Sequence, residues 1–139
     1  MHDYRKRWNP AKYFLKRILW NLSPYPKIVH YKDVARFFVA EEDRRENIYP
    51  SVLPNWDHSP RSGRGGSIIH GSSPELFEHN VLDALDAVSL KQPEHRLIFI
   101  KSWNEWGEGN YMEPDLRFGR GYLEALKHAV ESMESARRK

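Results

Sequence analysis

The sequence predicts a parallel α/β fold, and two observations support this prediction. Two short apolar stretches rich in β-preferring residues, 48–54 and 97–101, each end abruptly in a tryptophan-containing acidic segment. A stretch with helical periodicity lies between these two strands and another follows the second, and such alternation favours parallel pairing. In parallel α/β barrels the reacting groups lie at the carboxyl ends of strands, which is where both acidic segments fall.

The composition is that of one globular domain. With 139 residues, 40% of them hydrophobic and 13% aromatic, the chain is long enough to form a real core. It contains no cysteine, which excludes a disulfide framework, a thiolate nucleophile and a zinc–thiolate site. No apolar run reaches the roughly 18 residues of a membrane-spanning helix, and no signal-peptide core follows Met1. With Met1 taken as the start of the protein, these features predict a cytoplasmic location.

The first 30 residues form a basic segment with an amphipathic helix. From Met1 to Arg36 there are nine lysines and arginines against two aspartates. Asn9-Pro10 is typical of a helix start, and apolar residues at helical spacing predict a helix over 11–22. Such a helix can make peripheral contact with an anionic bilayer or pack on a core, and we expect packing. The charge is expected to be a solvated face, with no nucleic-acid partner.

The remaining elements follow in order. A second helix is predicted over 31–42, with Val34, Phe37 and Phe38 on its apolar side, and the strand at 48–54 comes next. The Gly-, Ser- and Arg-rich segment 58–71 is predicted to be a mobile loop. Ser73-Pro74-Glu75 then supplies a cap, a first position and an acidic first turn for a helix that ends before Pro93. The strand at 97–101 follows, and a last helix is predicted over 121–136.

The segment after the second strand carries the chemistry. It reads Trp103-Asn104-Glu105-Trp106-Gly107-Glu108-Gly109. Tryptophan faces stack on sugar rings, amides and carboxylates bind hydroxyls, and paired carboxylates supply the acid and base of glycoside cleavage. Three residues of extended chain span at most ~10 Å, so spacing does not separate retaining from inverting carboxylate pairs. In the alternative interpretation, one glutamate caps a loop amide and the other is solvated.

This motif, with Tyr111-Met112-Glu113-Pro114-Asp115 after it, resembles the signature of the WbsX-like family, which is related to the endo-α-mannosidases of glycoside hydrolase family 99. Two upstream segments, Pro54-Asn55-Trp56-Asp57-His58-Ser59-Pro60-Arg61 and Gly71-Ser72-Ser73-Pro74-Glu75-Leu76-Phe77, are similar to that family too. The resemblance covers residues 31–130. It implies that residues 31–139 are the C-terminal portion of a TIM-type (β/α)8 barrel, near its seventh and eighth strands. Because such barrels take ~250 residues, we expect this chain to be incomplete and its exposed strand edges to favour association.

The resemblance also implies residue roles. Glu105 would act as a base on the substrate's own 2-hydroxyl, and Glu108 as an acid and then as a base toward water. The mannosidases carry histidine where this chain has Gly107. This difference affects the substrate that the resemblance implies more than it affects the implied carboxylate pair. Asn104, Trp106, Trp56, Asp57 and Glu113 are predicted to bind substrate, Glu113 by orienting its neighbours. Of Trp103 and Trp106, one is expected to pack inside and the other to face substrate.

Arg61 is predicted to pair with Asp57, although it could instead clamp a phosphate or carboxylate. No histidine spacing is typical of a metal site and no phosphate-binding glycine loop follows a strand, so no metal or cofactor is expected.

The predicted function is that of a carbohydrate-active enzyme domain acting on α-linked glycans, linked to polysaccharide or lipopolysaccharide metabolism. The alternatives are a glycosyltransferase of lipopolysaccharide O-antigen assembly and an inactive fragment that only binds glycan. The expected partners are the glycan and the missing half of the barrel.

Overall fold

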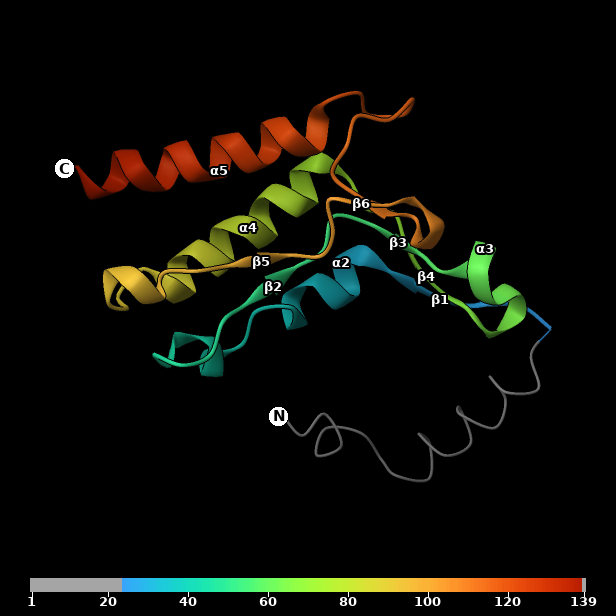
Figure 1. Ribbon diagram of the computed structural model, residues 1–139, viewed down its shortest axis with the longest axis horizontal. Helices are drawn as coiled ribbons and strands as arrows, with labels where there is room; N and C mark the ends of the chain where they lie inside the picture. The colour runs from blue at the N-terminus through green and yellow to red at the C-terminus, as the bar shows by residue number, and fades with distance from the viewer. Residues whose placement is uncertain (1–23, 139) are drawn as a thin grey trace.

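The computed structural model describes residues 24–138 (Figure 1). The strands are β1 (Lys27–His30), β2 (Ser51–Val52), β3 (Trp56–Asp57), β4 (Ser67–His70), β5 (Phe99–Ile100), β6 (Asn104–Glu105) and β7 (Asn110–Tyr111). The α-helices are α2 (Tyr31–Val34), α3 (Ser59–Ser62), α4 (Pro74–Val88) and α5 (Gly121–Arg137). Short 3-10 turns are η2 (Ala35–Phe37), η3 (Glu41–Arg44), η4 (Gly63–Gly65), η5 (Pro93–His95) and η6 (Trp106–Glu108). The mixed α/β class is therefore confirmed.

The two predicted strands pair in parallel. β2 lies beside β5 with Ser51 opposite Phe99 and Val52 opposite Ile100. The backbone N–H of Phe99 donates to the Pro50 carbonyl at 3.0 Å, and that of Lys101 donates to the Val52 carbonyl at 3.0 Å. α4 provides the helical crossover between the strands, as parallel pairing requires. The β-α-β unit predicted from the sequence is thus present, although each strand is shorter than its apolar stretch.

The segment predicted to be a mobile loop over 58–71 contains regular structure, and this prediction was wrong. It holds α3, η4 and the four-residue strand β4. β4 is the middle strand of a sheet in which β1 pairs with it in parallel and β3 in antiparallel fashion. The apolar pair Ile68-Ile69 lies in register with Ile28-Val29 of β1. Its glycine-rich surroundings hid this short strand, because it becomes one only by pairing with β1, 40 residues earlier in the chain, and with β3.

The helix predicted over 31–42 begins at Tyr31 but ends after one turn. Its first residue is fully buried, and the Tyr31 hydroxyl donates to the Leu53 carbonyl at 2.6 Å. The chain then tightens into η2 and restarts as η3, where the Asp43 carboxylate accepts from the Ala40 N–H at 2.8 Å. Tertiary contacts of Tyr31 and local capping by Asp43 therefore override the helical pattern.

The two long helices were predicted correctly. α4 and α5 lie side by side (Figure 1), and α4 also packs against β2. The core is made where they meet, from fully buried side chains such as Phe77, Val81, Met112 and Val52. The ring of Phe77 meets that of Tyr122 edge to face at 5.7 Å between centroids, a favourable aromatic geometry.

α4 starts as its sequence indicates, and this gives a test of the fold. The Ser73 hydroxyl accepts a hydrogen bond from the Leu76 N–H at 3.3 Å, and Pro74 occupies the first turn. We expect Ser73→Ala to lower the free energy of unfolding by about 1 kcal/mol, because an N–H of the first turn loses its partner. Thermal unfolding would measure the change, with the exposed Ser135→Ala in α5 as the control. Equal midpoints for the two variants would contradict the capping role.

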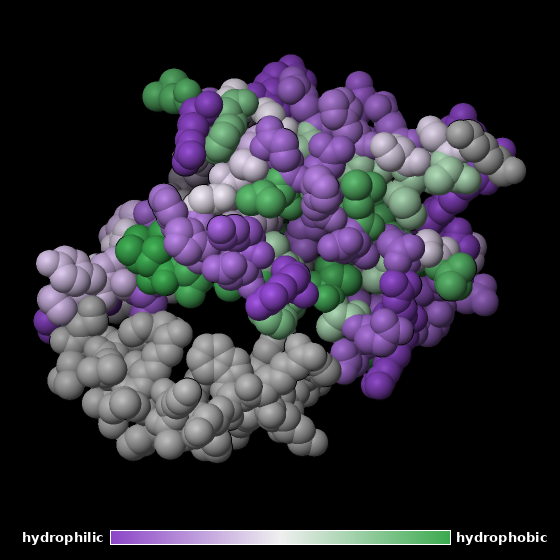
Figure 2. All heavy atoms as spheres, turned by 180° about the vertical axis from the view of Figure 1, so that it is seen from behind, coloured by the Kyte–Doolittle hydropathy of each residue, from purple (hydrophilic) through white to green (hydrophobic). Residues whose placement is uncertain are grey.

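Beside the core, large apolar side chains reach the surface. The Phe99 side chain in β5 is 56% exposed and that of Ile28 in β1 is 58% exposed. On the face seen in Figure 2, hydrophobic atoms appear at several separate places among hydrophilic ones.

Within residues 24–138 the strands form three small sheets rather than a closed barrel. The barrel-fragment prediction is not confirmed by this arrangement.

The described residues contain no helix that is both long enough and apolar enough to cross a bilayer. The amphipathic helix predicted over 11–22 lies outside the described residues. So does most of the predicted 1–30 segment.

Candidate active site

The predicted site residues 104–108 lie in the hairpin that follows β5. β6 and β7 pair in antiparallel fashion, with Asn104 opposite Tyr111 and Glu105 opposite Asn110, and η6 turns the chain between them. Gly109 closes the turn with a φ of +50°, a conformation that favours glycine. A Cβ at Gly109 would lie only 2.8 Å from the Asp57 Cβ. The glycine therefore lets this hairpin approach the segment that follows β2.

Two asparagines join the hairpin to that segment. Asn110 is fully buried, and its side-chain amide donates to the Asn55 carbonyl at 2.6 Å and to the Lys101 carbonyl at 2.9 Å. In return, the Asn55 side chain accepts from the Tyr111 N–H at 2.8 Å and donates to the Tyr111 carbonyl at 3.2 Å. The sequence analysis missed Asn110. A polar amide next to Gly109, amid aromatic residues, was the available signal for a buried backbone partner.

The two predicted catalytic glutamates come together around Arg61. The Arg61 guanidinium donates from Nη1 to Glu108 Oε1 at 2.9 Å and from Nη2 to Glu105 Oε1 at 3.1 Å. The predicted pairing of Arg61 with Asp57 was wrong. Asp57 instead accepts from the Ser59 N–H at 2.9 Å and the Ser59 hydroxyl at 2.5 Å, at the first residue of α3. α3 then places Arg61 over the hairpin.

The two carboxylates have different surroundings. The Glu108 side chain is 15% exposed and lies near two further nitrogen-bearing side chains, with His58 Nε2 3.5 Å from Oε1 and Lys101 Nζ 3.4 Å from Oε2. The Glu105 side chain is 42% exposed and meets Arg61. Glu105 is therefore the more open of the pair, and Glu108 lies within a ring of possible hydrogen-bond donors.

Trp56 forms the wall behind this ring. The Lys101 ammonium lies 4.9 Å from the centroid of the Trp56 ring, and His58 stacks on that ring at 5.7 Å. The indole N–H donates to the Ser67 hydroxyl at 3.0 Å. In this arrangement Trp56 holds Lys101 and His58 beside Glu108, while its role in binding substrate stays a prediction.

Trp106 and Tyr111 form an aromatic platform on the hairpin. Their rings stack with 3.7 Å between centroids and 12° between planes, and the Trp106 indole donates to Glu113 Oε2 at 2.6 Å. Burial raises the pKa of the Tyr111 phenol, and Asp115 adds to the shift, so Tyr111 is neutral near pH 7. Trp103 and Trp106 are both about half exposed, so neither packs inside as one was expected to do. Asn104 is exposed on β6.

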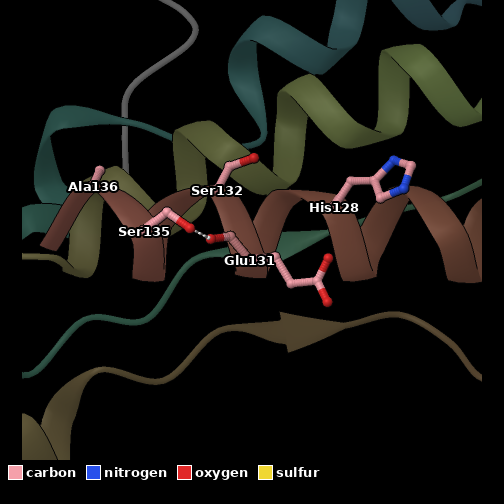
Figure 3. Close-up of a pocket in the computed structure, with 5 residues that line it drawn as sticks. All are labelled: His128, Glu131, Ser132, Ser135 and Ala136. Carbon is pink, nitrogen blue, oxygen red and sulfur yellow. Dashed lines mark hydrogen bonds between the residues drawn. The ribbon is translucent and has the colours of Figure 1, made fainter. Parts of the chain in front are cut away.

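A separate hollow of about 440 Å³ lies on α5, remote from these residues in the sequence. His128, Glu131, Ser132, Ser135 and Ala136 line it, all from one helix (Figure 3). The Ser135 hydroxyl donates to the Glu131 carbonyl of the same helix at 2.8 Å. The hollow contains none of the predicted site residues.

The fold and this hairpin define a mixed α/β protein with a tryptophan-lined pair of carboxylates. A family model described as glycosyltransferase WbsX matches residues 3–126. The chain belongs to this WbsX family.

It is 33% identical over 104 residues to the uncharacterized protein WxcX of two strains of Xanthomonas campestris pv. campestris. That alignment covers 74% of this chain and 15% of each relative, so the chain spans a small part of their length. No solved structure matches it.

Proposed function

We propose that the hairpin is part of an active site that cleaves α-linked glycans, with Glu105 and Glu108 as its reacting groups. The observation that supports this most is the meeting of both carboxylates on one guanidinium, beside an exposed aromatic platform. Paired carboxylates next to a stacking surface are what glycoside chemistry needs. Membership of a family described as glycosyltransferases agrees with a glycan as the substrate.

In the proposed reaction, Glu105 removes the proton of the substrate's 2-hydroxyl. The freed oxygen attacks the anomeric carbon and breaks its bond to the leaving oxygen, which takes a proton from Glu108. This attack leaves a three-membered ring of the 2-oxygen, C1 and C2. Glu108, now a carboxylate, deprotonates a water that attacks the anomeric carbon and opens this ring. Glu105 returns its proton to the 2-oxygen of the sugar. Glu105 begins and ends as a carboxylate, and Glu108 begins and ends protonated. The greater exposure of Glu105 agrees with direct contact to a substrate hydroxyl.

The aromatic platform would hold the sugar next to the carboxylates. We expect Trp106→Ala to lower kcat/KM about fivefold through a higher KM, because a stacked ring contributes about 1 kcal/mol. Trp106→Phe keeps a ring but loses the bond to Glu113, and its KM should lie between those of the parent protein and Trp106→Ala. Steady-state kinetics would measure both, with thermal unfolding as the control for folding. An unchanged KM in Trp106→Ala would exclude the platform from binding.

Sugar transfer is the second candidate function, and the description of the family favours it. A hydrolase releases free sugar from a panel of 2,4-dinitrophenyl α-glycosides in buffer alone. A transferase needs an activated sugar donor and an acceptor, and it releases little sugar to water. Testing the complete protein that carries this chain with both assays separates the two, and release to water without an acceptor is the result we expect. Glycan binding without turnover in either assay would indicate a binding remnant.

The proposed domain division is 1–30 for a basic segment and 31–139 for the last strands and helices of a barrel. Among residues 24–138 the β2–β5 pair has no further strand beside it and Phe99 in β5 is exposed, which supports this proposal because further strands would cover them. The partner would be the rest of the barrel. A role in polysaccharide or lipopolysaccharide metabolism is part of the same proposal.

A further inference from the structure

The proposed reaction does not explain the position of the Arg61 side chain. Its guanidinium lies between the two carboxylates, 2.9 Å from Glu108 and 3.1 Å from Glu105. The two contacts use different terminal nitrogens, so one rigid, planar group spans both side chains. A lysine ammonium is a point charge on a flexible stem and lacks this fork.

Gly107 makes room for this guanidinium. A Cβ built on Gly107 would lie 3.2 Å from Arg61 Nη2 and 3.4 Å from Glu105 Oε1. The distance to Arg61 Nη2 is tighter than an ordinary contact, and a longer side chain would take the space where the guanidinium lies. Gly107 has no positive φ, so its backbone conformation does not itself require glycine. The missing side chain therefore matters for what lies beside it.

The stem of Arg61 is anchored to the same loop. Asp57 accepts from Ser59 at the first residue of α3, and its Cβ lies against Gly109 of the hairpin. α3 and η6 are in direct contact. The helix that carries Arg61 and the turn between the glutamates are thus held together by the contact of α3 with η6 and by that of Asp57 with Gly109.

We infer that Arg61 is a positioning residue that sets the relative placement of the Glu105 and Glu108 carboxylates, and that Gly107 is small so that it can do so. This inference rests on the proposed function of the two glutamates. Arg61 acts through the carboxylates rather than on the substrate. Loss of Arg61 should therefore slow the chemical step on neutral and anionic glycosides alike.

The test uses four variants of the complete protein: Arg61→Gln, Arg61→Lys, Gly107→Leu and the double variant Arg61→Gln/Gly107→Leu. The probe is the 2,4-dinitrophenyl α-glycoside that the parent turns over fastest. We expect each single variant to lower kcat by about tenfold to a hundredfold with little change in KM, because small misplacements of reacting groups have effects of this size. The double variant should be no slower than Arg61→Gln alone, since both changes remove the same bridge.

Two neighbouring positions give matched controls. Arg64 is an exposed arginine in the next turn, and Gly65 is a glycine without positive φ whose added Cβ would meet nothing within 4 Å. Arg64→Gln and Gly65→Leu should keep the parental kcat and KM. Thermal unfolding of every variant shows whether a loss of rate reflects a loss of fold.

Several outcomes would overturn the inference. One is a raised KM with normal kcat, which is the result expected if Arg61 binds an anionic group of the substrate. The others are full activity of Arg61→Lys and independent, multiplying effects of the two changes in the double variant. A crystal structure of Gly107→Leu provides a readout that needs no turnover. It should show Arg61 displaced and the carboxylates shifted, and unmoved carboxylates would overturn the inference. Failure of the proposed function is distinguishable, because in that case Glu105→Gln and Glu108→Gln would themselves remain active.

Discussion

Replacing Glu105 or Glu108 by glutamine is expected to lower the turnover of an α-linked glycan by about a thousandfold in the complete protein, which is within the range of general acid–base catalysis. Glutamine keeps the shape of the side chain and its ability to accept from Arg61, but it can no longer exchange a proton. Folding should survive, because both contacts with Arg61 are partly exposed and such pairs contribute little to stability. Glu124→Gln on the exposed side of α5 is the matched control.

The two variants should differ when the leaving group is activated. A dinitrophenolate leaves with little need for protonation, so loss of Glu108 should matter less in the first step on an activated aryl α-glycoside. Loss of Glu105 should remain severe, because the 2-hydroxyl still has to be deprotonated. Burst-phase kinetics with aryl glycosides of graded leaving-group acidity would separate the steps. Near-normal turnover by both variants would return the hairpin to a packing or binding role.

Replacing Gly109 by alanine is expected to have the next largest effect, on stability and activity together. The added Cβ would meet Asp57 Cβ at 2.8 Å and the Asp57 backbone N at 3.0 Å, and the residue would also hold a φ of +50°. A left-handed conformation costs a non-glycine residue about 1–2 kcal/mol, and the contact adds to that cost. Relief of the contact would push the hairpin away from α3 and separate Glu105 and Glu108 from Arg61. We therefore expect a lower unfolding midpoint and at least about a hundredfold lower kcat/KM.

Gly119 separates the two causes. It has a similar φ of +54°, but an added Cβ would meet nothing within 4 Å. Gly119→Ala should therefore carry the conformational cost alone, with a modest fall in the unfolding midpoint and normal kinetics. Equal losses of activity in the two variants would show that strain, rather than the approach of Asp57, explains the effect.

The sequence predicted the elements whose signals are local. The cap at Ser73 and the apolar spacing up to Val88 define α4 without any knowledge of its partners, and the parallel pairing of β2 with β5 follows from the order of elements. β4 was missed because two isoleucines near glycine-rich turns become a strand only beside β1 and β3. Short strands depend on distant partners, which a single sequence does not display.

The same distinction holds for the site. The motif placed Glu105 and Glu108 together because they share one turn. The partner of Arg61 depended on the direction in which α3 leaves β3, and Asp57 was a plausible partner until its carboxylate was found to accept from Ser59, the first residue of that helix. Asn110 was missed because its side chain bonds to backbone carbonyls, one of them 55 residues away in the chain. Local chemistry was therefore predictable, and its alignment across segments was not.

The exchange of hydrogen bonds between Asn55 and Asn110 bears on how this site could be transplanted. Each asparagine satisfies the main chain of the other's segment, so neither loop has its shape without its counterpart. A chimera that received only residues 101–113 from a relative would contain only one of the two segments that these hydrogen bonds join. Exchange between members of the family should therefore succeed only when residues 54–61 travel with that hairpin, and the two segments form a single module for engineering.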